Sequence, residues 1–115
     1  MTPLQQSEPT QHIAALNDRC RTALGVGGRL VQTAGIAALS PADQSAIRER
    51  VERFDAFTPE NDPHHERDFG AIQYGDLRVF WKIDYYDRTG TAGSEDPSDP
   101  SQTLRVLTIM LASEY

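Results

Sequence analysis

The sequence predicts a single α+β domain in which an antiparallel sheet packs against two helices. In residues 10–24 and 41–55, apolar residues recur at helical spacing. Residues 69–111 contain three further segments whose apolar residues alternate or run continuously, as they do in strands, and these predict a meander. Together with a weaker strand between the two helices, the predicted order of elements is α-β-α-β-β-β, within one domain spanning residues 10–115.

The strongest strand signal is the stretch LRVFWKIDYYD, from Leu77 to Asp87, which contains the only tryptophan. Alternate residues of this stretch form an apolar face consisting of Leu77, Val79, Trp81, Ile83 and Tyr85. The other face carries Arg78, Phe80, Lys82, Asp84 and Tyr86. This alternation is typical of a strand with one buried face. Burial of each large apolar side chain is worth about 1.5–3 kcal/mol, so we expect the core to be centred here.

The N-terminal third begins with a polar segment, residues 1–9, that we predict to be a disordered tail. A helix is predicted from Thr10 to Leu24, with Gly25 as its C-cap and two further glycines as a flexible connection. Cys20 falls on the apolar side of this helix. It is interpreted as a core residue rather than a nucleophile, because no neighbour would lower the pKa of its thiol.

A weaker strand, residues 29–36, is predicted before the second helix. That helix has a clear start signal in Ser40-Pro41-Ala42-Asp43, where serine caps, proline occupies the first turn and the aspartate occupies the capping-box position. We expect it to run to Phe54 or Asp55. Its apolar stripe is Ile47, Val51 and Phe54.

The C-terminal half contains the meander. A loop over residues 58–68 precedes a strand at 69–74, and Gly75-Asp76 predicts a type II′ hairpin turn into the central strand. The sixteen residues that follow Tyr86 have no apolar periodicity, and a loop of this length is either functional or disordered. The closing segment, 104–111, is apolar on both faces, which predicts an internal strand covered on two sides.

Composition excludes several classes of function. The net charge is −6, and residues 55–99 hold eleven acidic and four basic side chains, a balance of −7. This acidity disfavours binding to a nucleic acid backbone. It is compatible with a basic protein partner, with a metal ion, or simply with solubility, which is the most ordinary explanation. No apolar run approaches the roughly 20 residues of a membrane span, and the N-terminus lacks the features of a signal peptide. The single cysteine cannot form an internal disulfide, so we expect a cytoplasmic protein. No cofactor is predicted.

Several stretches resemble the pattern of a small bacterial family, the domain of unknown function 3768 family. They are GGRLVQTAGIAAL, FDAFTPENDPH, DFGAI, FWKIDYYD, SEDPSDP and RVLTIMLASEY. The resemblance covers roughly residues 12–115. It implies a cytoplasmic protein of alphaproteobacteria, often encoded on plasmids and other mobile elements, and it implies no activity. The family pattern usually has a histidine where this chain has Arg67, so a role of that histidine as ligand or base would be absent here.

One loop has residue types that could hold a metal ion, namely Asp62, His64, Glu66 and Asp68. Histidine and carboxylates are the usual ligands of zinc and related ions, and histidine is also the natural base near neutral pH. Their spacing matches no standard motif. The alternative is an ordinary polar loop in which Asp62 caps a turn before Pro63.

The charged face of the central strand is the other candidate site. It combines aromatic side chains with charges, as protein-binding surfaces do. The residues predicted to bind a partner are Phe80, Lys82, Asp84, Tyr86, Asp87, Glu95, Asp96 and Asp99. Two alternatives remain at this point: a solvated face with a weak ion pair between Lys82 and Asp84, or burial of the aromatics beneath the N-terminal helix.

Three functions are compatible with these features. The favoured one is a non-enzymatic accessory or inhibitor protein that binds another protein through its acidic, aromatic-bearing sheet face. The second is a small metal- or histidine-dependent enzyme using the 62–68 loop. The third is an RNase-type toxin of a mobile element, which the acidity of the chain makes the least favoured.

Overall fold

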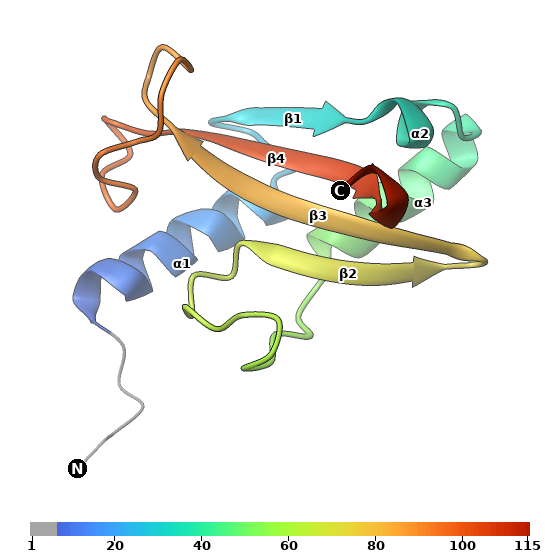
Figure 1. Ribbon diagram of the computed structural model, residues 1–115, viewed down its shortest axis with the longest axis horizontal. Coiled ribbons are helices and arrows are strands. Elements are labelled where there is room, and N and C mark those ends of the chain that lie inside the picture. The colour runs from blue at the N-terminus through green and yellow to red at the C-terminus, as the bar shows by residue number, and fades with distance from the viewer. Residues whose placement is uncertain (1–6) are drawn as a thin grey trace.

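The computed structural model describes residues 7–115, and its centre is one four-stranded sheet (Figure 1). The strands are β1 (Arg29–Gln32), β2 (Phe69–Tyr74), β3 (Leu77–Tyr86) and β4 (Leu104–Leu111), in the spatial order β1-β4-β3-β2. The helices are α1 (Glu8–Thr22), α2 (Ala34–Ala37) and α3 (Pro41–Glu52), followed after β4 by the 3-10 turn η1 (Ala112–Glu114). The predicted α+β class is confirmed.

The sheet is mixed, whereas the sequence predicted a purely antiparallel one. The meander β2-β3-β4 is antiparallel as predicted, but β1 pairs with β4 in parallel, with Arg29 opposite Val106. The connection after α1 brings the chain back beside the first residues of β4. A Cβ atom on Gly28 would collide with the carbonyl oxygen of Arg105, so only glycine permits this approach. β1 therefore starts at the same end of the sheet as β4 and runs in the same direction.

The hairpin between β2 and β3 forms where the sequence predicts it. Gly75 and Asp76 are the two turn residues, and Gly75 has a φ of +58° while Asp76 is not left-handed. A positive φ at the first turn residue alone is the requirement of a type II′ turn, and glycine meets it without strain.

Helix α1 begins two residues earlier than predicted. The Ser7 hydroxyl accepts the Thr10 backbone N–H at 3.2 Å and caps the helix, so Glu8 and Pro9 belong to the first turn and not to the predicted tail. The rest of that predicted tail, residues 1–6, lies outside the described part of the chain. The helix ends at Thr22, two residues before the predicted end.

The segment predicted as one strand over residues 29–36 divides into β1 and α2. The last ladder bond runs from the Thr33 N–H to the carbonyl of Ile109, at 3.1 Å, and the chain then turns into a single helical turn. This turn buries Ile36 completely in the core. The small residues Ala34, Gly35 and Ala37 fit a strand poorly, which explains the change.

Helix α3 starts as predicted. The Ser40 hydroxyl accepts the Asp43 backbone N–H at 3.1 Å. The Asp43 carboxylate does not close a capping box but accepts the hydroxyl of Tyr74 on β2 at 2.7 Å. The helix ends at Glu52, two residues before the earliest predicted end, and Phe54 still packs against the core from beyond it.

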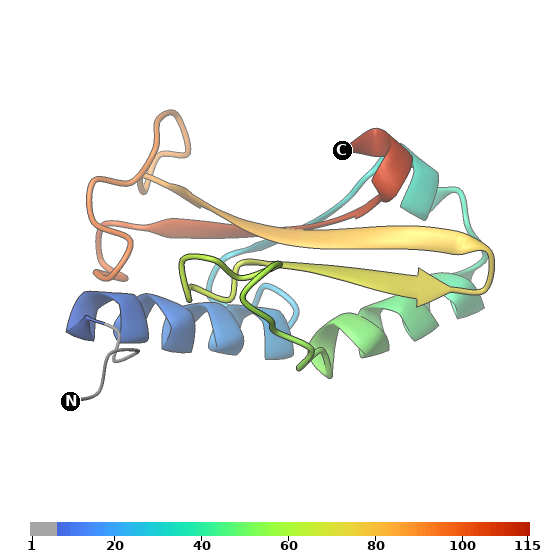
Figure 2. The same cartoon turned by 60° about the horizontal axis from the view of Figure 1, so that its bottom comes forward.

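The core lies between one face of the sheet and the helices α1 and α3, which both cover that face (Figure 2). Trp81 is fully buried as predicted and contacts Phe54 and Phe57 edge to face, with ring centroids 5.4 and 6.1 Å away. The indole lies directly against Gly70, where a Cβ atom would collide with it. The fully buried aliphatic residues of this core belong to α2, α3, β3 and β4. They are Ile36, Ile47, Val51, Val79, Leu107 and Ile109.

A buried polar network lies at the end of this core nearest the start of α1. Asn17 is fully buried and donates to the Tyr85 hydroxyl (2.7 Å) and to the carbonyl of Glu66 (2.9 Å). Its side-chain oxygen accepts the Arg105 Nε–H at 2.7 Å. Burial, together with a hydrogen bond from the hydroxyl to Glu66, raises the pKa of Tyr85, so this phenol stays a donor. The network joins α1, β3, β4 and the 62–68 loop.

At the other end of the sheet, one carboxylate fixes the C-terminal turn. Glu114 accepts hydrogen bonds from the Thr33 hydroxyl (2.6 Å), the Gly35 N–H (2.9 Å) and the Leu111 N–H (2.9 Å). These bonds, led by the one from Thr33, lower the pKa of Glu114. Because the ionised form is the one that holds the turn, the turn is attached at neutral pH and is released as the pH falls through this lowered pKa.

We therefore expect the Gly35 amide resonance to titrate with a midpoint below the ordinary range of a glutamate. An NMR pH titration measures this directly, and a Glu114→Gln variant should remove the transition. A Gly35 midpoint at the ordinary glutamate value would show that the three bonds are not formed in solution.

None of the helices in residues 7–115 has the length and apolarity that a membrane crossing requires.

Candidate functional site: the outer sheet face and a hollow beside α1

The sheet face opposite α1 and α3 is here called the outer face. Its side chains alternate with the core residues along each strand, as the register shows. They are Arg29, Val31, Phe69, Ala71, Gln73, Arg78, Phe80, Lys82, Asp84, Tyr86, Leu104, Val106, Thr108 and Met110.

Neither α1 nor α3 covers the outer face. In Figure 2 both helices lie below the sheet, whereas η1 and the first part of the 87–103 loop rise above it near its two ends. Between them the face holds a shallow hollow of about 400 Å³. Its lining combines apolar and polar side chains: Thr33, Lys82, Asp84, Tyr86, Val106, Thr108, Met110, Glu114 and Tyr115. Burial of the aromatics under the N-terminal helix, one of the alternatives above, does not occur.

Three aromatic side chains cluster beside this hollow. The Phe69, Phe80 and Tyr115 rings meet edge to face, with centroids 5.1 to 6.1 Å apart. The Arg78 guanidinium lies 5.5 Å from the centre of the Phe80 ring. Tyr115 remains 77% exposed although it touches both phenylalanines. The cluster is therefore well defined in geometry but only partly shielded from water.

The charges on the outer face differ from the acidic character expected from the sequence. Lys82 and Asp84 form the predicted ion pair, and both side chains are about one-third exposed, so the pair is worth at most about 1 kcal/mol. The other charged side chains that the strands contribute to the outer face are Arg29 and Arg78. Apart from Asp84, the acidic residues of the predicted site lie in the loop after β3.

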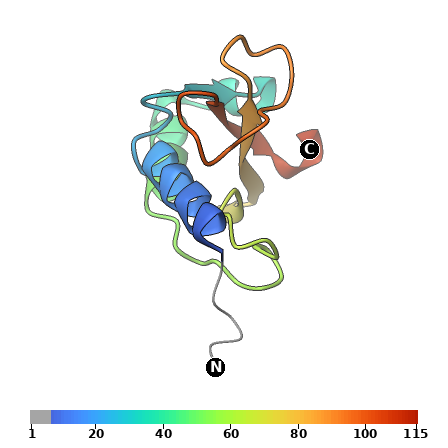
Figure 3. The same cartoon turned by 90° about the vertical axis from the view of Figure 1, so that its left-hand side faces the viewer.

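That loop, residues 87–103, uses most of its carboxylates for its own structure. Asp87 accepts from Thr89 and Thr91, and Asp99 accepts from Ser101 and Gln102; these bonds lower the pKa of both carboxyls. The Pro97 carbonyl accepts from Arg105, so the second half of the loop lies on the core side, next to α1. Figure 3 looks onto this end of the molecule, with α1 between the two long loops. Glu95, Asp96 and Asp99 thus border the end of the molecule and do not lie among the aromatics of the outer face.

The four candidate metal ligands have different surroundings. Asp62 is buried and accepts the Arg67 backbone N–H at 2.9 Å, while His64 is exposed. Glu66 accepts from Tyr85, and Asp68 is half-buried. Burial, followed by repulsion from Glu66 and Asp62, raises the pKa of Asp68. Within residues 7–115, no group of three or more His, Cys, Asp or Glu side chains is arranged to hold a metal ion.

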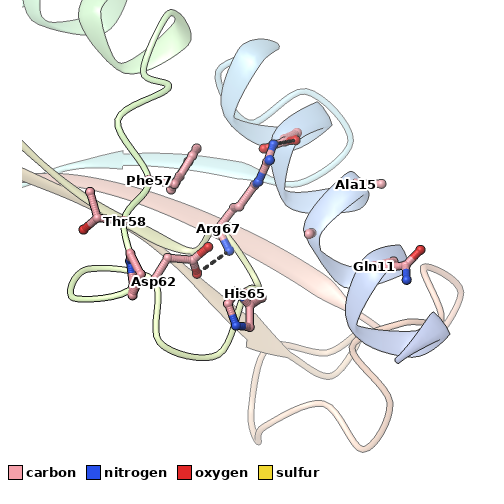
Figure 4. Close-up of a pocket in the computed structure, with 10 residues that line it drawn as sticks. Gln11, Ala15, Phe57, Thr58, Asp62, His65 and Arg67 are labelled. Atoms are coloured by element: carbon pink, nitrogen blue, oxygen red, sulfur yellow. Dashed lines mark hydrogen bonds and ion pairs between the residues drawn. The ribbon is translucent and has the colours of Figure 1, made fainter. Parts of the chain in front are cut away.

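The same loop nevertheless forms one wall of a second hollow, of about 410 Å³, whose other wall is α1 (Figure 4). The helix contributes one stripe, Gln11, Ala14, Ala15 and Asp18, and the loop contributes Phe57, Thr58, Pro59, Asp62, His65 and Arg67. His65 and Arg67 have φ values of +60° and +56°, which are costly for residues other than glycine. Two of the three left-handed non-glycine residues in the described chain therefore line this hollow.

Sequence reasoning missed parts of both surfaces. The outer side of β4 was predicted to be covered. Met110 is indeed buried there, but Val106 and Thr108 are half-buried and line the hollow of the outer face. The helix stripe beside the second hollow could have been found from the small residues Ala14 and Ala15 on the polar side of α1. His65 lines this hollow, although only its neighbour His64 was among the predicted ligands.

The comparisons with known proteins were made against family models, curated proteins and solved structures. No curated protein and no solved structure gives a significant match. One family model, Protein of unknown function (DUF3768), matches residues 32–114, a shorter span than the resemblance predicted from the sequence. The matched span contains α2, α3, the meander and both long loops but leaves out α1 and nearly all of β1. On this match the chain belongs to the DUF3768 family.

Proposed function

We propose that the protein is a non-enzymatic accessory or inhibitor protein that binds another protein through its outer face. The observation that carries this proposal is the absence of a helical layer, within residues 7–115, over a sheet face rich in apolar and aromatic side chains. A sheet normally buries such a face against another layer.

The residue types on the outer face agree with those of protein interfaces. Aromatic side chains, methionine and arginine are enriched there, and binding energy concentrates in a few such anchors. Phe80, Tyr86, Val106 and Tyr115 supply the apolar contacts, and Arg78 supplies a guanidinium beside them. The ion pair between Lys82 and Asp84 gives the centre of the face two oriented polar groups with no net charge.

The negative charge of the protein would mainly affect the rate at which the partner associates. The net charge of −6 and the two acidic loops favour a basic protein, whose association they would accelerate at low ionic strength. Because Glu95, Asp96 and Asp99 lie at the end of the molecule, they border the interface and do not anchor it.

Tyr86→Ala is expected to weaken the complex with such a partner by more than about 1 kcal/mol, mainly through faster dissociation. The reason is that Tyr86 is a half-buried aromatic on the outer face, outside the core. The partner is first captured from source cells on the immobilised wild-type protein, and its association and dissociation rates are then measured by surface plasmon resonance.

Two variants serve as controls for this prediction. Glu95→Lys should change the association rate and its dependence on salt but leave dissociation unchanged. His12→Ala, on the exposed side of α1, should change neither rate. If Tyr86→Ala unfolds the protein, or if the captured partner dissociates from it at the wild-type rate, the outer face is not the binding surface.

A further inference from the structure

The hollow between α1 and the 57–67 loop contains a buried carboxylate that lacks a counter-ion. Asp62 is only 6% exposed and lines this hollow. One of its oxygens accepts the Arg67 backbone N–H at 2.9 Å. In residues 7–115 no side chain forms an ion pair with Asp62, and no described group donates to its second oxygen. Its second oxygen is therefore free to accept a hydrogen bond from a ligand in the hollow.

The Arg67 side chain, the cation that lines the hollow, is already engaged by other groups. The Arg67 guanidinium extends over the Phe57 ring, 5.2 Å from its centre, and pairs with Asp18 on α1 at 2.9 Å. Asp18 also pairs with the buried Arg21 at 3.2 Å. These contacts fix Arg67 as part of the wall, and Figure 4 shows it crossing from the loop to the helix. The loop that forms the other wall is itself acidic, since residues 55–68 contain five acidic side chains and one basic side chain.

The rest of the lining suits an aliphatic stem that ends in hydrogen-bond donors. Ala14, Ala15 and Pro59 offer small apolar contacts on both walls. The Thr58 hydroxyl and an imidazole nitrogen of His65 can each accept a hydrogen bond. Long basic side chains bind in this way, with the methylene stem on apolar surface and the charged head on acceptors. The volume of about 410 Å³ is sufficient for one such side chain.

We propose that this hollow binds a primary ammonium or guanidinium group on an aliphatic stem, with the Asp62 carboxylate as its counter-ion. A metal ion is a poorer occupant, because no second carboxylate or histidine is placed to complete its coordination among the described residues. The site lies on the helix side of the sheet. It is therefore separate from the outer face, and its existence does not depend on the function proposed for that face.

The proposal is tested by following backbone amide shifts of the ¹⁵N-labelled protein during titration with two probes. One is the blocked peptide acetyl-Gly-Lys-Gly-amide, and the other is the free amine 1,5-diaminopentane. We expect saturable shifts at Ala14, Ala15, Asp62 and His65. Tighter binding of the peptide identifies a protein side chain as the natural occupant, and tighter binding of the diamine identifies a free amine. The same peptide acetylated on the lysine Nε should not bind.

Asp62→Asn is the decisive variant, because its amide oxygen still accepts the Arg67 N–H while the charge is lost. Affinity for the probes should fall about tenfold or more. The matched control is Glu60→Gln, which removes the same charge from an exposed position of the same loop outside the hollow and should change affinity little. If Asp62→Asn fails to fold, Ala15→Leu fills the hollow from an exposed helix position, with Ala42→Leu on α3 as its control.

Three results would overturn the proposal. The first is equal binding of the acetylated peptide. The second is an equal effect of Asp62→Asn and Glu60→Gln, which would indicate general attraction by the acidic loop. The third is the absence of saturable shifts at the residues of the hollow.

Discussion

Replacing Trp81 by alanine is expected to lower the free energy of unfolding by about 3–5 kcal/mol. The indole is fully buried at the centre of the core, packed against Phe54 and Phe57 and accommodated by Gly70. Removing it leaves a cavity in the core, and both phenylalanines lose their edge-to-face contact with the indole. Urea denaturation followed by far-UV circular dichroism measures the loss without relying on tryptophan fluorescence.

Trp81→Phe serves as the graded control, since it keeps an aromatic ring and should cost less than the alanine variant. In the wild-type protein, the tryptophan emission maximum should be that of a buried indole. A loss below about 1 kcal/mol for Trp81→Ala would mean that the core is centred elsewhere.

Asn17→Ala is expected to cost about 3 kcal/mol, which is a large effect for a polar residue. The side chain makes three hydrogen bonds inside the protein, and one of its partners is the charged Arg105. Alanine at this position leaves the Arg105 Nε–H and the carbonyl of Glu66 without their partner in a buried region. Thermal or urea unfolding measures the cost.

His12→Ala, on the exposed side of the same helix, should change stability by less than about 0.5 kcal/mol. If Asn17→Ala and His12→Ala have the same effect, the polar network does not contribute to the stability of the fold.

The elements that local physics determines could be predicted from the sequence. The alternation around Trp81 identified β3 and its buried face, and the Gly75-Asp76 pair identified the hairpin. The Ser40-Pro41 signal identified the start of α3. In each case a few neighbouring residues carry the whole signal, so no knowledge of the rest of the chain is needed.

The features that depend on distant contacts could not be predicted. The parallel pairing of β1 depends on the approach of Gly28 to Arg105, which are far apart in sequence. Asn17 and Arg21 are polar residues outside the apolar stripe of the predicted helix. Both are nevertheless buried, because β4, the 62–68 loop and the end of α3 supply their partners.

In the candidate sites, too, local patterns could be predicted and distant contacts could not. The alternation of residues along β3 correctly placed Phe80, Lys82, Asp84 and Tyr86 on one face. Sequence alone could not show that Glu95 to Asp99 lie in a loop that folds toward α1, because the loop has no periodicity and is fixed by its own aspartate turns and by Arg105. The hollow beside Asp62 likewise requires the 57–67 loop to lie against α1.

The central claim, that the outer face binds a protein partner, is tested most directly by methyl cross-saturation NMR on the complex with the captured partner. The account predicts that saturation passes from the partner to the methyl groups of Val31 and Val106 on the outer face, and not to those of Val51 and Val79 in the core. Transfer to methyl groups on α1 or α3, with the Val31 and Val106 signals unaffected, would contradict it.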